Sequence, residues 1–175
     1  NGYDTLITCG AKQSNHCRAT ALVGAQLGMK VHLVLADKAE ESSQAGNFFL
    51  DKLAAAKISL YNKSEYQSNL ESILLAWQDH YKKNGSKALI IPTGGSDGLG
   101  IWGYIGCAEE MRDDVVKENL FDAHIVCATG SGGTQAGLNV GVEIFRLPLT
   151  IWGVNVSDSA DYFVRKIERD IADLQ

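Results

Sequence analysis

Hydrophobic and polar residues form blocks along the chain, and these blocks predict strands and helices in turn. Short apolar runs that favour strands lie at 5–10, 30–36, 57–62, 87–93, 122–130 and 149–156. Helix-like segments follow them at 15–28, 46–56, 64–83, 107–120, 134–145 and 163–174. The strands are continuous apolar runs without hairpin signals, which predicts parallel strands covered by helices on both faces. The fold class is therefore α/β.

Two local signals mark helix ends. Gly28 stands where a glycine would end the first helix. Ser64 and Gln67 form a capping box at the start of the third helix, whose apolar face then continues to Tyr81.

Composition narrows the classes of partner. The chain has 175 residues, 21% of them charged, and a net charge of −5. It offers no polybasic surface, so we expect no nucleic-acid partner. No apolar run is long enough to span a bilayer, so we expect no membrane partner either. The chain begins with Asn rather than Met, close to an apolar run, as a cut through a larger protein would.

The four cysteines do not have the spacing of a metal site. Cys9, Cys17, Cys107 and Cys127 form no CxxC pair and have no paired histidines nearby, so we expect no structural zinc and no other metal. We interpret them as reduced thiols, which indicates a cytoplasmic protein.

Three loops follow strands and precede helices, where ligands bind in open α/β sheets. The first, Gly130–Thr134, is rich in glycine and hydroxyl groups and carries no Lys or Arg. It suits a phosphate bound by backbone N–H groups and hydroxyls, but a tight turn would use the same residues. It matches neither a P-loop nor the GxGxxG spacing of dinucleotide-binding proteins.

The second loop, "GAKQSNH" at 10–16, gathers neutral polar side chains at the start of a helix. One reading is a simple N-cap, and the other is a site for a carboxylate. The third, "TGGSDGLGIWGY" at 93–104, could be a lid, a hinge or a crossing between domains.

Three separated motifs together carry a resemblance. "GAKQSNHCRATA", "PTGGSDGLGIWGY" and "ATGSGGTQAG", in this order, resemble the family of D-cysteine desulfhydrase and aminocyclopropane-carboxylate deaminase. These are pyridoxal-phosphate enzymes of the tryptophan-synthase-β fold type, known as fold type II. The resemblance covers essentially the whole chain and is closer to the desulfhydrase branch.

The resemblance implies roles for particular residues. Ser131, Gly132, Gly133 and Thr134 would hold the phosphate of pyridoxal phosphate. Ser14, Asn15 and His16 would lie on the loop that receives the substrate carboxylate, with Gln13 shaping that loop. Asn15 would also bond the ring hydroxyl of the cofactor.

The resemblance also implies that catalytic parts are missing. The lysine that forms a Schiff base with the cofactor in this family lies upstream of the strand at 5–10, before Asn1. The family's catalytic tyrosine and the partner of its pyridine nitrogen lie beyond Gln175. We therefore assign no catalytic residue here. Lys12 lies in the carboxylate loop, but nothing in the sequence supplies the desolvation that would make it a substitute.

The resemblance divides the chain at about residue 95. Residues 1–95 would form the smaller α/β domain with the carboxylate loop, and residues 96–175 an incomplete part of the larger cofactor-binding domain. Two strands alone leave unpaired edges and apolar faces, so we expect the second half to dock on the first, to pair in a homo-oligomer or to be loosely ordered.

Two functions follow from these observations. One is a pyridoxal-phosphate-dependent lyase or deaminase that converts a small amino acid into a keto acid and ammonia, with sulfide from D-cysteine, and that is inactive as this chain alone. The alternative is a truncated, non-catalytic module that binds a phosphorylated ligand or forms oligomers.

Overall fold

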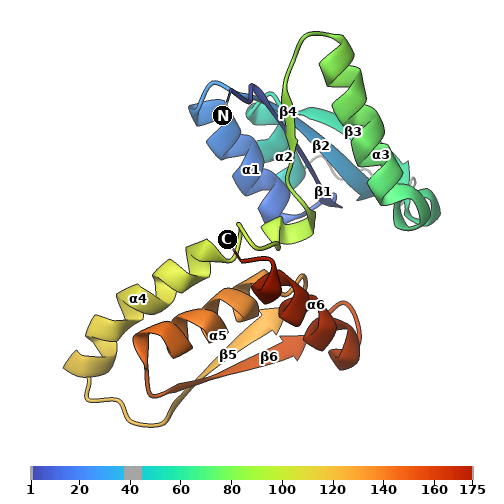
Figure 1. Ribbon diagram of the computed structural model, residues 1–175. Coiled ribbons are helices and arrows are strands. Elements are labelled where there is room, and N and C mark those ends of the chain that lie inside the picture. The colour runs from blue at the N-terminus through green and yellow to red at the C-terminus, as the bar shows by residue number, and fades with distance from the viewer. Residues whose placement is uncertain (1, 38–44, 175) are drawn as a thin grey trace. The chain divides into compact units, whose positions relative to one another are not determined.

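The computed structural model describes residues 2–37 and 45–174, and Figure 1 shows the order of their elements. The chain divides into two compact units, Asn1–Gly94 and Gly95–Gln175. Each unit contains its own parallel sheet.

The first unit is built on a four-stranded sheet. Its strands are β1 (Thr5–Ala11), β2 (Lys30–Asp37), β3 (Lys57–Asn62) and β4 (Ala88–Ile90), in the order β3-β2-β1-β4. All three pairings are parallel, and β1 runs beside β2 from the pair Thr5–Lys30 to the pair Ala11–Ala36. Parallel strands end at a common edge, so the loop after β1 lies at the carboxyl edge of this sheet.

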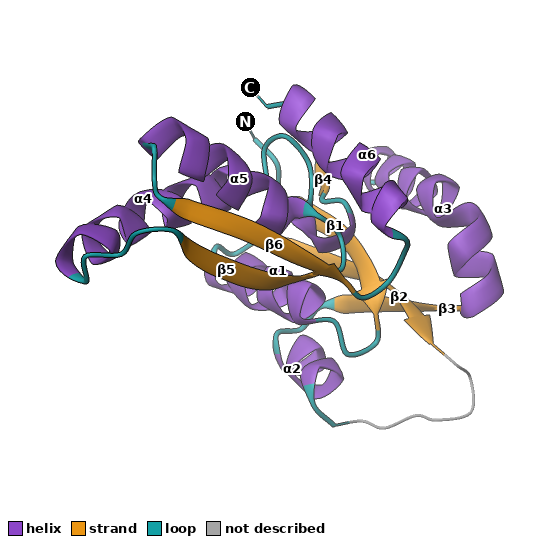
Figure 2. Ribbon diagram, turned by 90° about the horizontal axis from the view of Figure 1, so that it is seen from below, coloured by secondary structure: helices purple, strands orange, loops and turns teal. Residues whose placement is uncertain are grey.

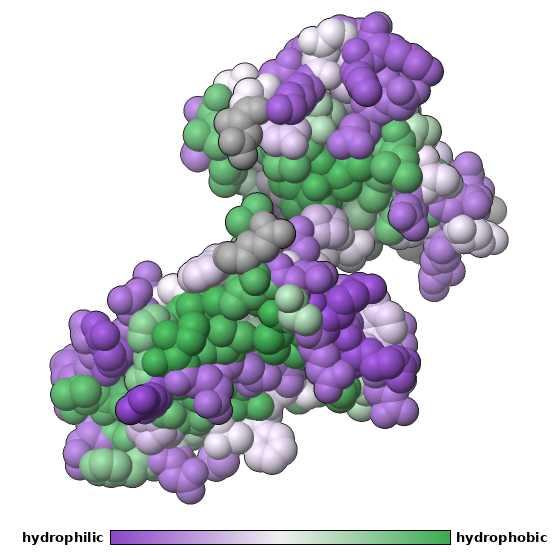
Figure 3. Space-filling view, viewed as in Figure 1, coloured by the Kyte–Doolittle hydropathy of each residue, from purple (hydrophilic) through white to green (hydrophobic). Residues whose placement is uncertain are grey.

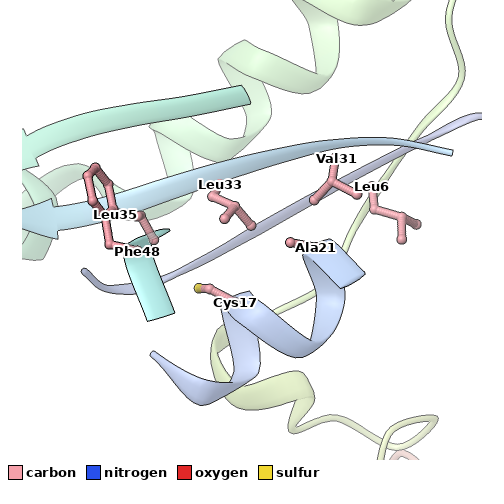
Figure 4. Packing of buried hydrophobic residues seen from close by; sticks show 7 residues of the cluster. All are labelled: Leu6, Cys17, Ala21, Val31, Leu33, Leu35 and Phe48. Atoms are coloured by element: carbon pink, nitrogen blue, oxygen red, sulfur yellow. The ribbon is translucent and has the colours of Figure 1, made fainter. Parts of the chain in front are cut away.

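Helices cover both faces of this sheet, as the apolar strands predict. Against one face lie α1 (Asn15–Gln26) and α2 (Asn47–Leu53), which contribute Cys17, Ala21 and Phe48 to a cluster with Leu6, Val31, Leu33 and Leu35 (Figure 4). Against the other lies α3 (Lys63–Lys83), whose Leu74 packs with Ile7, Cys9, Val34 and Ala88. Each fully buried aliphatic side chain contributes about 1.5–3 kcal/mol, so these two clusters fix the sheet and its loops.

The second unit has two parallel strands, β5 (Ala123–Thr129) and β6 (Leu149–Asn155), which lie side by side in Figure 2. Its helices are α4 (Trp102–Lys117), α5 (Gly133–Phe145) and α6 (Ala160–Ala172), and the short 3₁₀ turn η1 (Thr93–Gly95) spans the boundary between the units. All three helices or their first turns contribute to one core, made of Ile101, Ile105, Ala136, Phe163 and Ile167. Figure 3 shows a hydrophobic region of the surface over α5.

One face of the β5–β6 pair remains exposed. Alternate residues of both strands point away from the core, and among them Val126, Trp152 and Val154 are 67%, 54% and 53% exposed. Val126 is the register partner of Trp152. The indole N–H of Trp152 donates to Nδ1 of His124 on the same face, over 2.8 Å. These residues form a contiguous apolar surface, here called the outer sheet face.

Several element boundaries differ from the sequence predictions. The second helix ends at Leu53 rather than 56, because Ala55 has a positive φ of 56° that no helix continues. The fourth strand is only Ala88–Ile90 rather than 87–93, since Pro92 has no N–H for a ladder. The fourth helix begins earlier, at Trp102 inside the glycine-rich stretch.

The cap of α3 also differs from the prediction. Asn62, not Ser64, is the N-cap, and its Oδ1 accepts the N–H of Glu65 at 2.9 Å. The Glu65 carboxylate in turn lies 3.3 Å from Nδ2 of Asn62. The capping pair therefore lies two residues earlier than predicted. By contrast, the predicted stop at Gly28 is confirmed, since Leu27 is the C-cap and Gly28 has a φ of 68°.

All four cysteines lie in the described part of the chain and are free thiols, with Cys9 and Cys17 buried. Over residues 2–37 and 45–174, no group of three or more His, Cys, Asp or Glu side chains is placed to hold a metal ion. In the same residues, no helix combines the length and apolar character needed to cross a membrane.

Candidate functional site

The glycine-rich turn Gly130–Thr134 connects β5 to α5 in the second unit. Gly132 is the residue before the helix and has a φ of 96°, a conformation that favours glycine. Gly133 is buried, and a Cβ atom there would lie 2.6 Å from Oγ of Ser96. Both glycines are therefore required by the geometry of the turn.

Ser96 supports this turn from the third glycine-rich motif. Its hydroxyl donates to Oγ of Ser131 at 2.8 Å and accepts the backbone N–H of Gly133 at 3.1 Å. Since Oγ of Ser131 accepts a hydrogen bond from Ser96, the hydroxyl proton of Ser131 is left to donate elsewhere. Ser96 itself is only 4% exposed, so this support is part of the packed structure.

The turn presents several donors to one place. Within the described residues, the N–H groups of Ser131, Gly132 and Thr134 have no hydrogen-bond partner, and neither has the Thr134 hydroxyl. These groups stand at the N-terminus of a 13-residue helix, where the helix dipole favours negative charge. The arrangement can bind a phosphate or another small anion.

A lysine that the sequence did not connect with this turn lies behind it. Nζ of Lys166 on α6 donates to the backbone oxygen of Ser96 at 2.9 Å and pairs with the buried carboxylate of Asp170. A Cβ atom at Gly132 would lie 3.7 Å from Cγ of Lys166. Because Asp170 compensates its charge, Lys166 fixes Ser96 rather than adding a net cation to the turn.

The carboxyl edge of the first unit's sheet carries the second loop, residues 13–16. Oγ of Ser14 accepts the N–H of Cys17 at 3.2 Å and so caps α1, which bears out the N-cap reading. An oxygen that accepts this bond still carries a hydroxyl proton that can be donated to a ligand. The N–H groups of Asn15 and His16 in the first turn have no partner within the described residues.

His16 is held in one tautomer by its neighbour. Thr8 on β1 is fully buried, and its hydroxyl donates to the carbonyl of Ile91 at 2.9 Å. Nε2 of His16 lies 2.7 Å from the same hydroxyl oxygen, so the arrangement that satisfies both contacts has Nε2–H donating to Thr8. Burial lowers the pKa of His16, so the ring is neutral at pH 7.

Gln13 and Asn15 are both bound to α2. The N–H of Asn47 donates to Oε1 of Gln13 at 2.8 Å, and its side-chain Nδ2 donates to the Gln13 carbonyl at 2.8 Å and to Oδ1 of Asn15 at 2.9 Å. The Gln13 amide Nε2 donates to the Ala45 carbonyl at 3.0 Å. Gln13 therefore shapes the loop through contacts with a helix about 34 residues later.

Lys12 does not point into solvent. It is only 8% exposed, and its Nζ forms an ion pair with Asp37 on β2 at 3.0 Å. The same ammonium lies 4.7 Å from the centre of the Phe48 ring. A lysine fixed in this way is poorly placed to attack an aldehyde, because Asp37 and the Phe48 ring hold its ammonium group in place.

The predicted site residues thus fall into two groups, one in each unit. Gln13, Ser14, Asn15 and His16 lie together in the first unit, and Ser131, Gly132, Gly133 and Thr134 lie together in the second. Sequence reasoning missed Ser96 and Asn47 as their supports. Ser96 lies in the third loop, whose glycines are its most obvious local feature. No local signal in the sequence marks Asn47.

Comparison with known proteins gives consistent matches over nearly the whole chain. A family model described as "Pyridoxal-phosphate dependent enzyme" matches residues 1–173. A Thermotoga maritima protein named "Putative 1-aminocyclopropane-1-carboxylate deaminase" is 41% identical over 175 residues, which are 99% of this chain and 54% of that protein. The mitochondrial bifunctional D-cysteine desulfhydrase/1-aminocyclopropane-1-carboxylate deaminase of Arabidopsis thaliana is 38% identical over 167 residues, 91% of this chain and 42% of its own length.

A solved structure agrees with these relatives. The crystal structure of an ACC deaminase homologue superimposes with a TM-score of 0.85 and 31% identity, and the match covers 98% of this chain and 51% of that chain. The chain spans about half the length of the relatives it matches.

Proposed function

Because the chain belongs to the family of pyridoxal-phosphate-dependent enzymes, we propose that it is part of a lyase or deaminase that acts on D-cysteine or a similar small amino acid. The products would be a keto acid and ammonia, with sulfide from D-cysteine. The observation that carries this proposal is the turn Gly130–Thr134, whose donors are open at a helix N-terminus while Ser96 supports it from behind.

The residues of this turn fit the phosphate of the cofactor. A dianionic phosphate needs several donors and close approach to the backbone, and the turn offers three N–H groups and the hydroxyls of Ser131 and Thr134. Gly133 N–H is occupied by Ser96, so we assign the binding to the other donors.

The loop at 13–16 fits the carboxylate of an amino-acid substrate. The Ser14 hydroxyl proton and the N–H groups of Asn15 and His16 would be the donors. His16 would bind the carboxylate through its backbone N–H group. Its side chain would add no positive charge, since the ring is neutral and its Nε2–H is donated to Thr8. Asn15 would donate to the ring hydroxyl of the cofactor.

Pyridoxal phosphate, when bound, supplies an electron sink that stabilises negative charge next to the substrate amino group. The part proposed for these residues is to hold the phosphate at the turn of the second unit and to orient a carboxylate at the loop of the first unit. Proton transfer at the substrate needs a base, and Lys12 is not proposed for it because Asp37 holds its ammonium.

The ion pair of Lys12 with Asp37 also favours a second function. A chain that binds the phosphate without an available lysine would act as a non-catalytic module for a phosphorylated ligand. We also propose a cytoplasmic location, which the free thiols support, and a homo-oligomer, which the exposed outer sheet face supports.

The test is binding of pyridoxal phosphate, measured by fluorescence titration of the purified protein, with pyridoxal as the ligand that lacks the phosphate. Thr134→Val removes one donor, and we expect it to weaken binding of pyridoxal phosphate by about tenfold, the loss of one hydrogen bond to a charged group. Binding of pyridoxal should not change. Ser68→Ala, which removes a hydroxyl at an exposed position of α3 in the first unit, is the control.

Equal affinity for pyridoxal phosphate and pyridoxal would contradict the phosphate assignment. Binding without turnover of D-cysteine is the result that we expect of this chain alone. Release of keto acid and sulfide with the cofactor present would show that these residues suffice for the lyase, and would contradict the non-catalytic module.

A further inference from the structure

Asn47, at the start of α2, is the residue that fixes the direction of the Asn15 amide. Its side-chain Nδ2 has two acceptors, the Gln13 carbonyl at 2.8 Å and Oδ1 of Asn15 at 2.9 Å. A carbonyl oxygen can only accept, so the amide of Asn47 must present its nitrogen to Gln13. The Asn47 oxygen is turned the other way, where Nη1 of Arg18 approaches it at 3.4 Å.

The orientation of Asn47 determines that of Asn15. A donor facing Asn15 requires an acceptor in return, so Oδ1 of Asn15 faces Asn47. The Asn15 Nδ2 then carries the two protons that remain for a ligand, and it has no partner within the described residues. Reversal of this amide would present an oxygen instead and would repel any ligand oxygen placed there.

Asn47 is itself held by the backbone around it. Its N–H donates to Oε1 of Gln13 at 2.8 Å. The preceding Gly46 has a φ of 66°, and a Cβ atom there would lie 2.6 Å from the same Gln13 oxygen. Asn47 is therefore joined to the loop by both its backbone and its side chain, rather than by one chance contact of two surface side chains.

We propose that Asn47 is a positioning residue that turns the Asn15 amide so that its N–H groups face the ligand, and that this selects a ligand with an acceptor oxygen at that point. The inference deepens the proposed function, since the acceptor would be the ring hydroxyl oxygen of pyridoxal phosphate. The amide orientation itself does not depend on that function and can be measured without any ligand.

Asn47→Asp tests the orientation. A carboxylate has the same shape but only accepts, so it should draw Nδ2 of Asn15 toward itself and leave Oδ1 facing outward. We expect the Asn15 side-chain amide protons, followed by ¹H–¹⁵N NMR, to exchange rapidly with water in the wild type and to become protected in Asn47→Asp. Asn69→Asp adds the same charge at an exposed position of α3 and should change nothing. Unchanged exchange of the Asn15 protons in folded Asn47→Asp would overturn the inference.

The ligand measurement compares pyridoxal phosphate with 3-deoxypyridoxal phosphate, which lacks the ring hydroxyl. We expect Asn47→Asp to weaken binding of pyridoxal phosphate by about tenfold and to leave binding of the deoxy analogue unchanged. Asn15→Asp keeps an acceptor toward Asn47 but presents an oxygen outward, so it should show the same selective loss even if Asn47→Asp unfolds.

The two failures can be told apart. If the Asn15 amide reverses in Asn47→Asp but the wild type binds no pyridoxal phosphate, the positioning role stands and the proposed function fails. If pyridoxal phosphate binds and both variants lose affinity equally for the two ligands, selection by Asn15 is overturned.

Discussion

At the scale of single residues, Asp51 on α2 is a carboxyl group in an unfavourable, buried environment. It is fully buried, and neither carboxylate oxygen has a hydrogen-bond partner within the described residues. Burial raises the pKa of this carboxyl to about 6, and the positive charge of Arg18 on α1 offsets only part of that effect. The folded protein therefore holds a proton on Asp51 at a pH where the unfolded chain has released it.

This carboxyl makes stability depend on pH in a predictable direction. Between pH 3.8 and about 6 the folded state binds more protons than the unfolded state, so the contribution of Asp51 to stability is lost as pH rises through this range. We expect Asp51→Asn to be more stable than the wild type at pH 8 by about 1–3 kcal/mol, and to differ little at pH 4.

Urea unfolding of both proteins across this range checks the expectation. The difference between them isolates Asp51 from His16 and His32, whose pKa values are lowered by burial and whose titration acts in the opposite direction. Asp113→Asn, at a position 89% exposed on α4, is the control. A stability difference that is constant with pH would rule out Asp51 as the source.

At the scale of elements, the apolar pattern of the sequence is sufficient to predict the features that depend on neighbouring residues alone. Each predicted strand and helix occurs in the predicted order within the described residues, because apolar blocks in the sequence reflect burial against a sheet directly. An N-cap is also a local feature, and of the two candidates in the loop, Ser14 and Asn15, the cap in the structure is Ser14. Contacts such as Asn47 with Asn15, or Ser96 with Gly133, join residues about 30 or more positions apart, and no periodic signal encodes them.

The cap of α3 shows where local signals compete. Both Asn62 and Ser64 are good N-cap residues with a partner three positions later, and the strand geometry of β3 decides for Asn62, which has an extended φ/ψ of −64° and 154°. Ser64 then lies inside the first turn. We expect Asn62→Ala to lower the free energy of unfolding by about 1 kcal/mol and Ser64→Ala to change it by less than about 0.5 kcal/mol. Urea unfolding measures both, and a larger loss from Ser64→Ala would contradict the assigned cap.

At the scale of the whole molecule, the two units differ in how completely they cover their sheets. The first unit has helices packed on both faces of its sheet, whereas the second leaves the outer sheet face exposed. An apolar surface of this kind on a folded protein marks an interaction site. The partner that we propose for the outer sheet face is a second copy of this chain.

We therefore expect the isolated chain to self-associate through the outer sheet face at micromolar concentration. Val126 lies in the middle of this face beside Trp152, so Val126→Lys would place an ammonium in the contact and should weaken association at least about tenfold. Val23→Lys changes an equally apolar side chain, 50% exposed on α1, and should leave association unaltered. Sedimentation velocity over a concentration series distinguishes the variants. A wild-type protein that stays monomeric throughout, or equal weakening by both substitutions, would show that another surface or no surface mediates assembly.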